Sequence, residues 1–214
     1  MRIARHALVV SDTIIPILYS PLLVERFPDI GLLIGCGDLP YYYLEYLVST
    51  LNAPLFFVRG NHDKLVDYGG EHERSSPGGG IDLHRRVENW RGVLLAGVEG
   101  SLRYRNGPFQ YSQVEMWLHV FKLIPGLLIN RIRHRRFLDI FVTHAPPFGV
   151  HDREDLPHQG IRAFRWLIKT FTPGYHFHGH IHTYNPNTTI ETIVGSTRVI
   201  NAYGYNTTLV QIDG

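Results

Sequence analysis

Residues 54–63, PLFFVRGNHD, carry the pattern from which the fold of this chain is deduced. The apolar run PLFFV ends at a short turn, and three polar residues, Asn61, His62 and Asp63, follow the glycine at once. A short apolar run that stops at a polar turn is typical of a buried strand in an α/β sheet. Two earlier runs, HALVV at 6–10 and IGLLIG at 30–35, end in the same way near Asp12 and Asp38.

Two helices are expected between these strands. One should begin near Ser20 and Pro21, with serine as the N-cap and proline in the first helical position. The other should run from about Pro40 to Leu51, with leucines at helical spacing. The alternation predicts a βαβαβ unit with right-handed crossovers, in which ligands bind beyond the carboxyl ends of the strands.

The rest of the chain is expected to complete an α/β domain. Residues 64–85 have the composition of a loop, and residues 85–100 that of a hairpin with a turn at 89–92. Ser112 and Glu115 form a capping-box pattern, which predicts a helix with apolar residues recurring at 114, 117, 118 and 121. A short basic helix should follow to about His134. Strands are then expected at 137–142 and 175–179, with a helix at about 160–170 between them and a mostly antiparallel sheet in the tail.

The composition excludes several classes of protein. The 214 residues, 44% of them apolar, suit one globular domain, and a net charge of +2 gives no strong signal for nucleic acid. Cys36 is the only cysteine, so an internal disulfide and a cysteine-based zinc site are excluded. The first apolar run is too short for a signal peptide, and no run approaches the roughly 18 residues that span a bilayer. A cytoplasmic location is the default expectation.

Polar clusters follow five of the predicted strands. They are Asp12, Asp38, Asn61 to Asp63, His144, and the pair His180 and His182. Clusters at the carboxyl ends of neighbouring strands can converge on one point. Carboxylate and imidazole without thiolate suit manganese, zinc or iron, and such a mixture suits two ions that share a bridging carboxylate. A pair of this kind polarises a phosphoryl oxygen and activates a water for attack.

The ordered pattern D…GD…GNHD…H…GHIH resembles the calcineurin-like metallophosphoesterase superfamily, and in particular bacterial phosphoesterases related to cyclic-nucleotide phosphodiesterases. The resemblance extends from Asp12 to His182. It implies a four-layer αββα sandwich with two mixed central sheets, the metallophosphoesterase fold. We therefore expect one domain over residues 1–214, with a basic helical insertion around 108–136.

The resemblance also implies a role for each residue of the motifs. Asp38 would bridge two divalent cations, manganese by preference, with iron, zinc or nickel as alternatives. The first site would contain Asp12, Asp38 and His182, and the second site Asp38, Asn61, His144 and His180. His62 would lie near the leaving-group oxygen and donate a proton or a hydrogen bond to it. Asp63 would cap the turn or orient His62.

One position departs from the family pattern. The first motif of the family is usually Asp-x-His, whereas this chain has Ile14 two residues after Asp12, and isoleucine cannot bind a metal. Three interpretations stay open: a weak but functional first site, a substitute ligand from elsewhere, or a fold without catalytic activity. The segment with His151, Asp155 and His158 either contacts the substrate, supplies that ligand or is a solvated loop. Tyr41 is a further candidate substrate residue.

We therefore expect a phosphoric ester hydrolase that acts on a small-molecule phosphodiester or phosphomonoester, with the diester favoured by the resemblance alone. The alternatives are a catalytically silent scaffold and a peripheral membrane hydrolase of a phospholipid-type substrate. The basic residues motivate the second alternative, because seven Lys/Arg and one acidic residue lie between Arg103 and Arg136. The sequence does not predict the oligomeric state.

Overall fold

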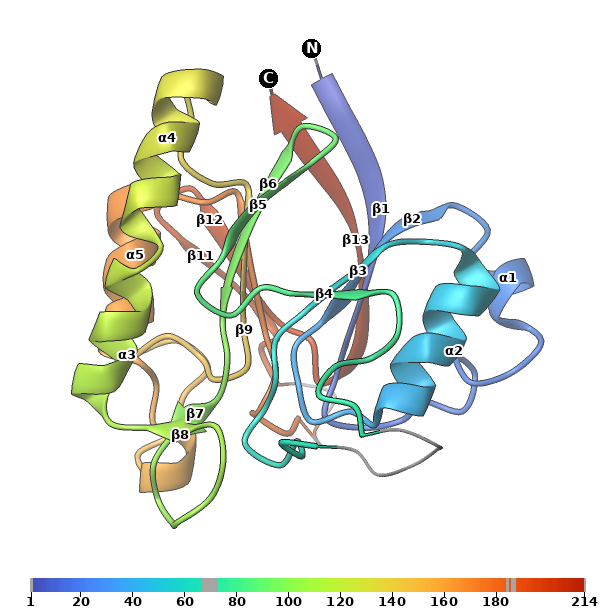
Figure 1. Cartoon of the computed structure of the whole chain (residues 1–214), viewed down its shortest axis with the longest axis horizontal. Coiled ribbons are helices and arrows are strands. Elements are labelled where there is room, and N and C mark those ends of the chain that lie inside the picture. Colours follow the sequence, from blue (N-terminus) through green and yellow to red (C-terminus); the bar gives the residue numbers. More distant parts are fainter. Residues whose placement is uncertain (1, 67–72, 184, 186–187, 214) are drawn as a thin grey trace.

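Two mixed β-sheets lie face to face in the computed structural model, which describes residues 2–66, 73–183, 185 and 188–213 (Figure 1). The first sheet has the strand order β13-β1-β2-β3-β4. Its members are β1 (Arg2–Ser11), β2 (Ile30–Gly35), β3 (Leu55–Phe57), β4 (Gly80–Asp82) and β13 (Gly204–Asp213). Strands β1 to β4 run parallel, and β13 pairs with β1 in the antiparallel sense.

The second sheet has the strand order β11-β12-β10-β9-β6-β5. Its members are β5 (Val87–Trp90), β6 (Val93–Val98), β9 (Ile140–Thr143), β10 (Tyr175–His178), β11 (Glu191–Val194) and β12 (Thr197–Asn201). The four central strands are parallel, and the edge strands β5 and β11 are antiparallel to their neighbours. A separate short pair consists of β7 (Ser101–Leu102) and β8 (Gln110–Tyr111).

Helices cover the outer face of each sheet (Figure 1). The first sheet carries α1 (Leu23–Arg26) and α2 (Tyr41–Leu51), and the second carries α3 (Gln113–Phe121), α4 (Ile124–His134) and α5 (Arg162–Phe171). Alternate residues of β1 show the layering: Val9 packs between the two sheets, whereas Leu8 packs against the side of α2. The expected four-layer αββα arrangement with two mixed sheets is therefore confirmed.

Several expected elements are confirmed close to their predicted bounds. The helix α2, the hairpin of β5 and β6, and α4 ending at His134 all form where the sequence indicates. The capping box is present, because the Ser112 hydroxyl accepts from the Glu115 backbone and the Glu115 carboxylate accepts from Ser112. None of the helices in the described part of the chain combines the length and the apolar character needed to cross a membrane.

Other expectations were wrong in detail. The helix near Ser20 starts later, after Leu22, because the Ser20 hydroxyl donates to the Ile17 carbonyl instead of capping the helix. Part of the predicted loop at 64–85 is the edge strand β4, which pairs with β3; residues 67–72 of that loop lie outside the described residues. The tail does not form one closing sheet, because β11 and β12 join the second sheet and β13 joins the first.

Three of the four apolar residues that predicted α3 do not face the core, and the fourth, Trp117, is partly buried against it. Val114, Leu118 and Phe121 are exposed, whereas Met116 and Val120 on the other side of the helix are buried. The helix has apolar residues on two sides, and the sequence periodicity alone did not determine which side packs against the sheet.

Candidate metal centre

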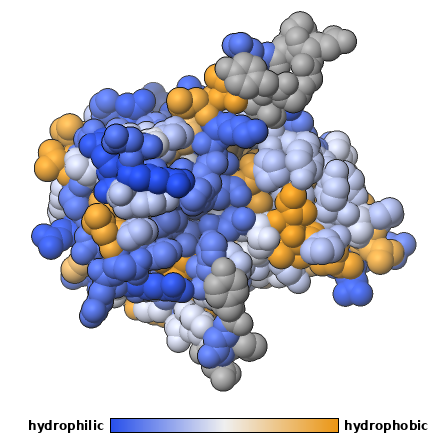
Figure 2. Space-filling view, turned by 90° about the horizontal axis from the view of Figure 1, so that it is seen from below, coloured by the Kyte–Doolittle hydropathy of each residue, from blue (hydrophilic) through white to orange (hydrophobic). Residues whose placement is uncertain are grey.

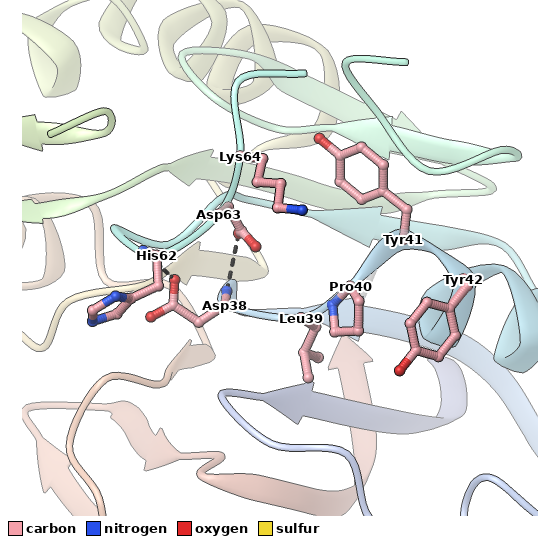
Figure 3. A pocket seen from close by; sticks show the side chains of 8 residues that line it. All are labelled: Asp38, Leu39, Pro40, Tyr41, Tyr42, His62, Asp63 and Lys64. Carbon is pink, nitrogen blue, oxygen red and sulfur yellow. Dashed lines mark hydrogen bonds between the residues drawn. The ribbon is translucent and has the colours of Figure 1, made fainter. Parts of the chain in front are cut away.

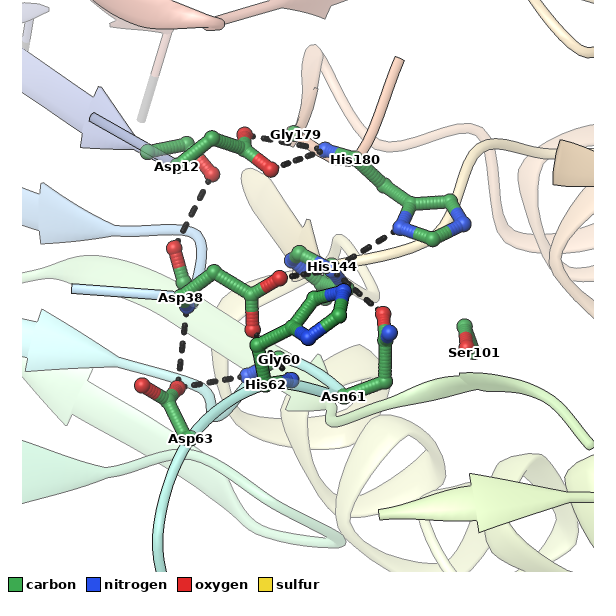
Figure 4. A network of polar contacts seen from close by, with 12 residues as sticks. Asp12, Asp38, Gly60, Asn61, His62, Asp63, Ser101, His144, Gly179 and His180 are labelled. Atoms are coloured by element: carbon green, nitrogen blue, oxygen red, sulfur yellow. Dashed lines mark hydrogen bonds and ion pairs between the residues drawn. The ribbon is translucent and has the colours of Figure 1, made fainter. Parts of the chain in front are cut away.

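The polar clusters at the strand ends meet at one end of the sandwich (Figure 4). Asp12 follows β1, Asp38 follows β2, and Asn61 follows β3 in the first sheet. His144 and His180 follow β9 and β10 in the second sheet. Parallel strands bring their carboxyl ends to the same edge, so segments far apart in the sequence become neighbours. Seen from this end, the middle of the surface is mostly hydrophilic (Figure 2).

The ring nitrogen Nε2 of His144 is the point at which four segments meet. It lies 3.0 Å from Oδ1 of Asn61, 3.1 Å from Nδ1 of His180 and 3.3 Å from Oδ2 of Asp38. Ligand atoms of Asp38, His144 and His180 all lie within 4.8 Å of one another. Ligands bound at about 2.1 Å to one divalent cation, at right angles, are about 3 Å apart. The donors of the second site therefore fit a divalent cation.

Hydrogen bonds on the far side of each ring orient the two histidines. Nδ1 of His144 donates to the Cys36 carbonyl at 2.8 Å, and Nε2 of His180 donates to the Pro157 carbonyl at 2.7 Å. In the neutral imidazole, a proton on one nitrogen leaves the other as an acceptor. When both rings are neutral, the nitrogens that face the cluster are thus the unprotonated ones, as metal binding requires.

The proposed ligands of the first site lie further apart, and His182 among them is more exposed, than the ligands of the second site. Nε2 of His182 lies 3.7 Å from Oδ1 of Asp12, and the His182 side chain is 43% exposed and stacks against Tyr203. The Asp12 carboxylate accepts the backbone N–H of His180 at 3.0 and 3.1 Å. Ile14 packs against the apolar cluster between the first sheet and its helices. Position 14 therefore contributes to packing, and no ligand comes from it.

The electrostatics of the cluster favour a positive charge at His144. Burial alone would lower the pKa of this imidazole, but the negative charge of Asp38 and its hydrogen bond raise the pKa to about 9. Burial would likewise raise the pKa of Asp38, yet the charge and hydrogen bond of His144 lower it to about 2. The pKa of Asp12 is also lowered, because its hydrogen bond to His182 and the charge of His144 outweigh burial. A metal ion competes with the proton for such an imidazole.

Three of these residues have a backbone conformation that side chains rarely adopt. The φ angles of Asp12, Asp38 and His180 are 65°, 58° and 67°. Left-handed conformations of residues other than glycine cluster at functional sites, because the surrounding structure must hold them in place.

Two glycines of the motifs allow the segments to approach closely. A Cβ atom on Gly60 would lie 2.1 Å from Oδ1 of Asp38, and one on Gly179 would lie 1.9 Å from Oγ of Ser11. Only glycine fits at these two positions.

His62 lies beside a residue that the sequence did not place. Nη2 of Arg105 is 3.2 Å from Nδ1 of His62, and the neighbouring Tyr104 hydroxyl accepts a hydrogen bond from Asn61 at 3.1 Å. Both residues belong to the loop between β7 and β8. No motif marks this loop. Its approach depends on long-range pairing, in which the N–H of Gly100, just before β7, donates to the carbonyl of Arg59, just after β3, at 2.8 Å.

The Asp63 carboxylate accepts hydrogen bonds from two backbone N–H groups. Its Oδ2 accepts the N–H of Gly60 at 2.7 Å and the N–H of Asp38 at 2.9 Å, and so joins two strand-end loops (Figure 3 and Figure 4). Burial and the charge of Asp38 raise the pKa of this carboxyl to about 6. The arrangement agrees with turn capping, and no contact of Asp63 with the His62 ring is seen.

A pocket of about 340 Å³ opens beside Asp38 and His62 (Figure 3). The other residues that line it are Leu39, Pro40, Tyr41, Tyr42, Asp63 and Lys64. Tyr41 is buried, and its hydroxyl donates to the Ser75 carbonyl at 3.0 Å. Tyr41 can therefore contribute a ring wall, whereas Tyr42, which is 51% exposed, presents a larger accessible ring.

The three candidate residues of the segment after His144, which are His151, Asp155 and His158, do not share one location. Both ring nitrogens of His151 are engaged, with His178 and Thr192, each at 2.9 Å, so the expected substrate contact does not fit this ring. His158 pairs with Asp155, and its ring centre lies 5.3 Å from that of His180. The segment thus borders the second site through His158.

His176 and His178 are fully buried behind the centre, as core or supporting residues would be.

A four-layer sandwich with carboxylate, amide and imidazole donors at its strand ends defines the class of metal-binding phosphoesterases. A model of the family described as calcineurin-like phosphoesterase matches residues 22–184, and the chain belongs to this family. The family is one of dinuclear metal-dependent enzymes, and the Asp and His cluster described above lies within the matched region.

The comparisons also show relatives of known sequence or structure. The Caenorhabditis elegans "UPF0046 protein K07C11.7" is 25% identical over 194 residues, which cover 81% of this chain and 62% of that protein. The chain thus spans less than two thirds of the length of this relative.

TT1561 of Thermus thermophilus has a TM-score of 0.62 at 17% identity, over 97% of this chain and 100% of that chain. GAP50, the anchor in the inner membrane complex of Plasmodium, has a TM-score of 0.56 at 12% identity, over 94% and 71%. At these identities the solved structures share the fold.

Proposed function

We propose that this chain hydrolyses a small-molecule phosphate ester with the help of two divalent cations held at the strand ends. The observation that carries the proposal is the meeting of Asp38, Asn61 and His180 around Nε2 of His144, within 3.3 Å. Membership of a hydrolase family supports it. The second site would contain Asp38, Asn61, His144 and His180, and the first site Asp12, Asp38 and His182.

Divalent cations at these sites would neutralise charge on the phosphoryl oxygens and make a water nucleophilic near neutral pH. Manganese is the proposed metal, because oxygen and imidazole donors without thiolate suit it. A phosphodiester is the proposed substrate class, on the strength of the resemblance to cyclic-nucleotide phosphodiesterases.

His62 is proposed to donate a hydrogen bond or a proton to the leaving group. The guanidinium of Arg105 can only donate, so Nδ1 of His62 is the acceptor in the 3.2 Å contact. The neutral ring then carries its proton on Nε2, where it can donate a hydrogen bond to a departing oxygen. Complete transfer of a proton requires the imidazolium form, because a neutral ring that lost this proton would become an imidazolate. General acid catalysis of this kind contributes about 10²–10⁴-fold to the rate.

The pocket beside His62 is proposed to hold the part of the substrate that leaves. Its apolar walls, Leu39, Pro40 and the ring of Tyr42, suit an aromatic or apolar group, and Lys64 adds one positive charge at the rim. Tyr42→Ala should raise KM for an aryl ester more than for a methyl ester of the same phosphate. Comparing the variant with the wild type on each ester cancels the intrinsic reactivity of the two leaving groups.

The direct test of the activity uses the purified chain stripped of metal and then reconstituted with Mn²⁺. It should hydrolyse chromogenic phosphodiesters or monoesters, and a chelator should abolish the reaction. A protein that holds Mn²⁺ with all these donors intact and still leaves every ester unchanged would refute the proposal.

A catalytically silent scaffold of the same fold is the second candidate, and the observation in its favour is Ile14. Because Ile14 packs against the apolar cluster of the first sheet, the first site has fewer donors than the second. The metal-replete but inert result described above would favour this scaffold.

A further inference from the structure

The outer sides of α3 and α4 carry an unusual number of exposed apolar residues. Both helices bury their inner side in the same core cluster, through Met116 and Leu127 among others, so their outer sides face away from the same sheet. We call six residues there the outward stripe: Val114 (69% exposed), Leu118 (55%), Phe121 (46%), Leu128 (49%), Ile129 (48%) and Ile132 (82%). Exposed apolar residues gathered on two consecutive helices indicate an interaction site.

The helix α2 on the opposite face shows that the architecture does not require this exposure. Its leucines Leu44 and Leu47 are 4% and 1% exposed, and its exposed positions are Tyr42 and Ser49. Both helical layers cover a sheet, but α1 with its N-cap and α2 expose two aliphatic side chains, Leu22 and Val24, whereas α3 and α4 expose five.

Positive charge accompanies the outward stripe. Residues 113–136 include five Lys/Arg and one acidic residue, Glu115, which pairs with Arg103 at 3.0 Å. Arg136 pairs with Asp139. None of the described carboxylates lies within ion-pair distance of the remaining four cations, Lys122, Arg131, Arg133 and Arg135. The face therefore combines apolar side chains with unneutralised positive charge.

We propose that the outward stripe and these four cations form a docking surface for an anionic lipid membrane, with α3 and α4 lying in the plane of the interface. An amphipathic helix binds such a surface by inserting apolar side chains while its cations attract anionic headgroups. Trp117 and Trp166, whose rings pack 5.4 Å apart beside Phe121, add the half-buried indoles that favour the level of the headgroups.

Charge argues against a second copy of the chain as the occupant. A two-fold symmetric contact would place the same surface on both subunits and bring like cations together. An anionic membrane would instead bury the apolar side chains and pair the cations with anionic headgroups at the same time. The helices α3 and α4 run along the side of the sandwich (Figure 1), whereas the proposed metal ligands follow the carboxyl ends of the strands, so docking leaves the candidate metal centre accessible. The proposal does not depend on the phosphoesterase activity.

The test is flotation of the full chain, loaded with Mn²⁺, with vesicles of phosphatidylcholine alone or with about 30% phosphatidylserine. The wild type should float with the anionic vesicles, and the binding should weaken as salt is raised. The triple variant Leu128→Ser, Ile129→Ser, Ile132→Ser and the double variant Arg131→Gln, Arg133→Gln should each weaken the partition at least about tenfold. The matched control is Leu22→Ser with Val24→Ser, two residues on the opposite face with 45% and 48% exposure.

The control variant should bind like the wild type, and circular dichroism should show that all variants are folded. Failure of the wild type to float with anionic vesicles at low salt would overturn the proposal. So would full binding by the triple serine variant, because adsorption would then be purely electrostatic. A concentration-dependent dimer that only the stripe variants abolish, without vesicle binding, would assign the surface to a second copy instead.

Discussion

The guanidinium of Arg105 lies 3.2 Å from Nδ1 of His62, although 43 residues separate them in the chain. His62 also donates its backbone N–H to Oδ1 of Asp38 at 2.7 Å. The proposed proton donor is therefore held between the metal centre and a cation that determines which ring nitrogen carries the proton.

This relationship predicts that Arg105→Ala lowers kcat about tenfold, a part of the 10²–10⁴-fold that a general acid supplies. Metal content should stay unchanged, because Arg105 contacts none of the proposed ligands. The loss should also be smaller for esters with acidic leaving groups, which need no proton. The control is Arg103→Ala in the same loop, whose partner is Glu115. Equal losses for good and poor leaving groups would show that Arg105 has another role.

The ligand assignment predicts two different kinds of loss. Asp38→Asn or His180→Ala should remove both activity and bound metal, because each deletes a donor at the second site. His62→Ala should slow turnover while the metals stay bound. Metal analysis after gel filtration distinguishes the two outcomes. Loss of metal from the His62 variant would contradict the division between ligands and proton donor.

The first site should gain affinity when its missing donor is restored. Ile14→His is expected to tighten Mn²⁺ binding at one of two sites in a calorimetric titration, and removal of a packed apolar side chain should cost about 1 kcal/mol or more of stability. Ile14→Ala is the matched control, since it loses the same packing without gaining a donor. An identical titration for both variants would indicate that another residue already fills this position.

Gly179 should tolerate no side chain. In Gly179→Ala the new Cβ would lie 1.9 Å from Oγ of Ser11 and 2.5 Å from Oδ2 of Asp12, so the two loops must separate. We expect a loss of about 1–3 kcal/mol in the free energy of unfolding, measured by urea denaturation, together with weaker metal binding. Gly174→Ala is the control, because its Cβ would meet nothing closer than 3.5 Å. Similar stability for both variants would mean that the approach of these loops is not rigid.

The buried His84 should make the protein less stable in acid. Burial, reinforced by the charge of Arg85, lowers the pKa of His84 to about 3, whereas the unfolded imidazole titrates near 6.5. The folded pKa is the lower one, so the unfolded state takes up the proton first and stability falls as pH drops from about 6.5 toward 3. The contribution of one such group is at most about 1.4 kcal/mol per pH unit. His84→Gln should reduce the slope of the free energy of unfolding against pH, between pH 6.5 and 3, by the equivalent of about one bound proton. An unchanged slope would contradict this assignment.

The sequence predicted the meeting of the donor side chains at the strand ends better than it predicted their surroundings, for a physical reason. Asp38, Asn61 and His144 each follow a buried strand, and parallel strands fix where such residues meet. Arg105 lies in a loop whose path depends on long-range packing, so no local pattern could place it beside His62.

The orientation of α3 was ambiguous for another reason. Met116 on one side of the helix and Leu118 on the other are equally apolar, and only the folded sheet determines which of them is buried.

The most direct test of the central claim is anomalous diffraction from a crystal of the chain soaked in Mn²⁺ and phosphate. The account predicts an anomalous peak within bonding distance of Asp38, Asn61, His144 and His180, and a weaker one near Asp12 and His182. A crystal that shows manganese only elsewhere, with these side chains unliganded, would contradict it.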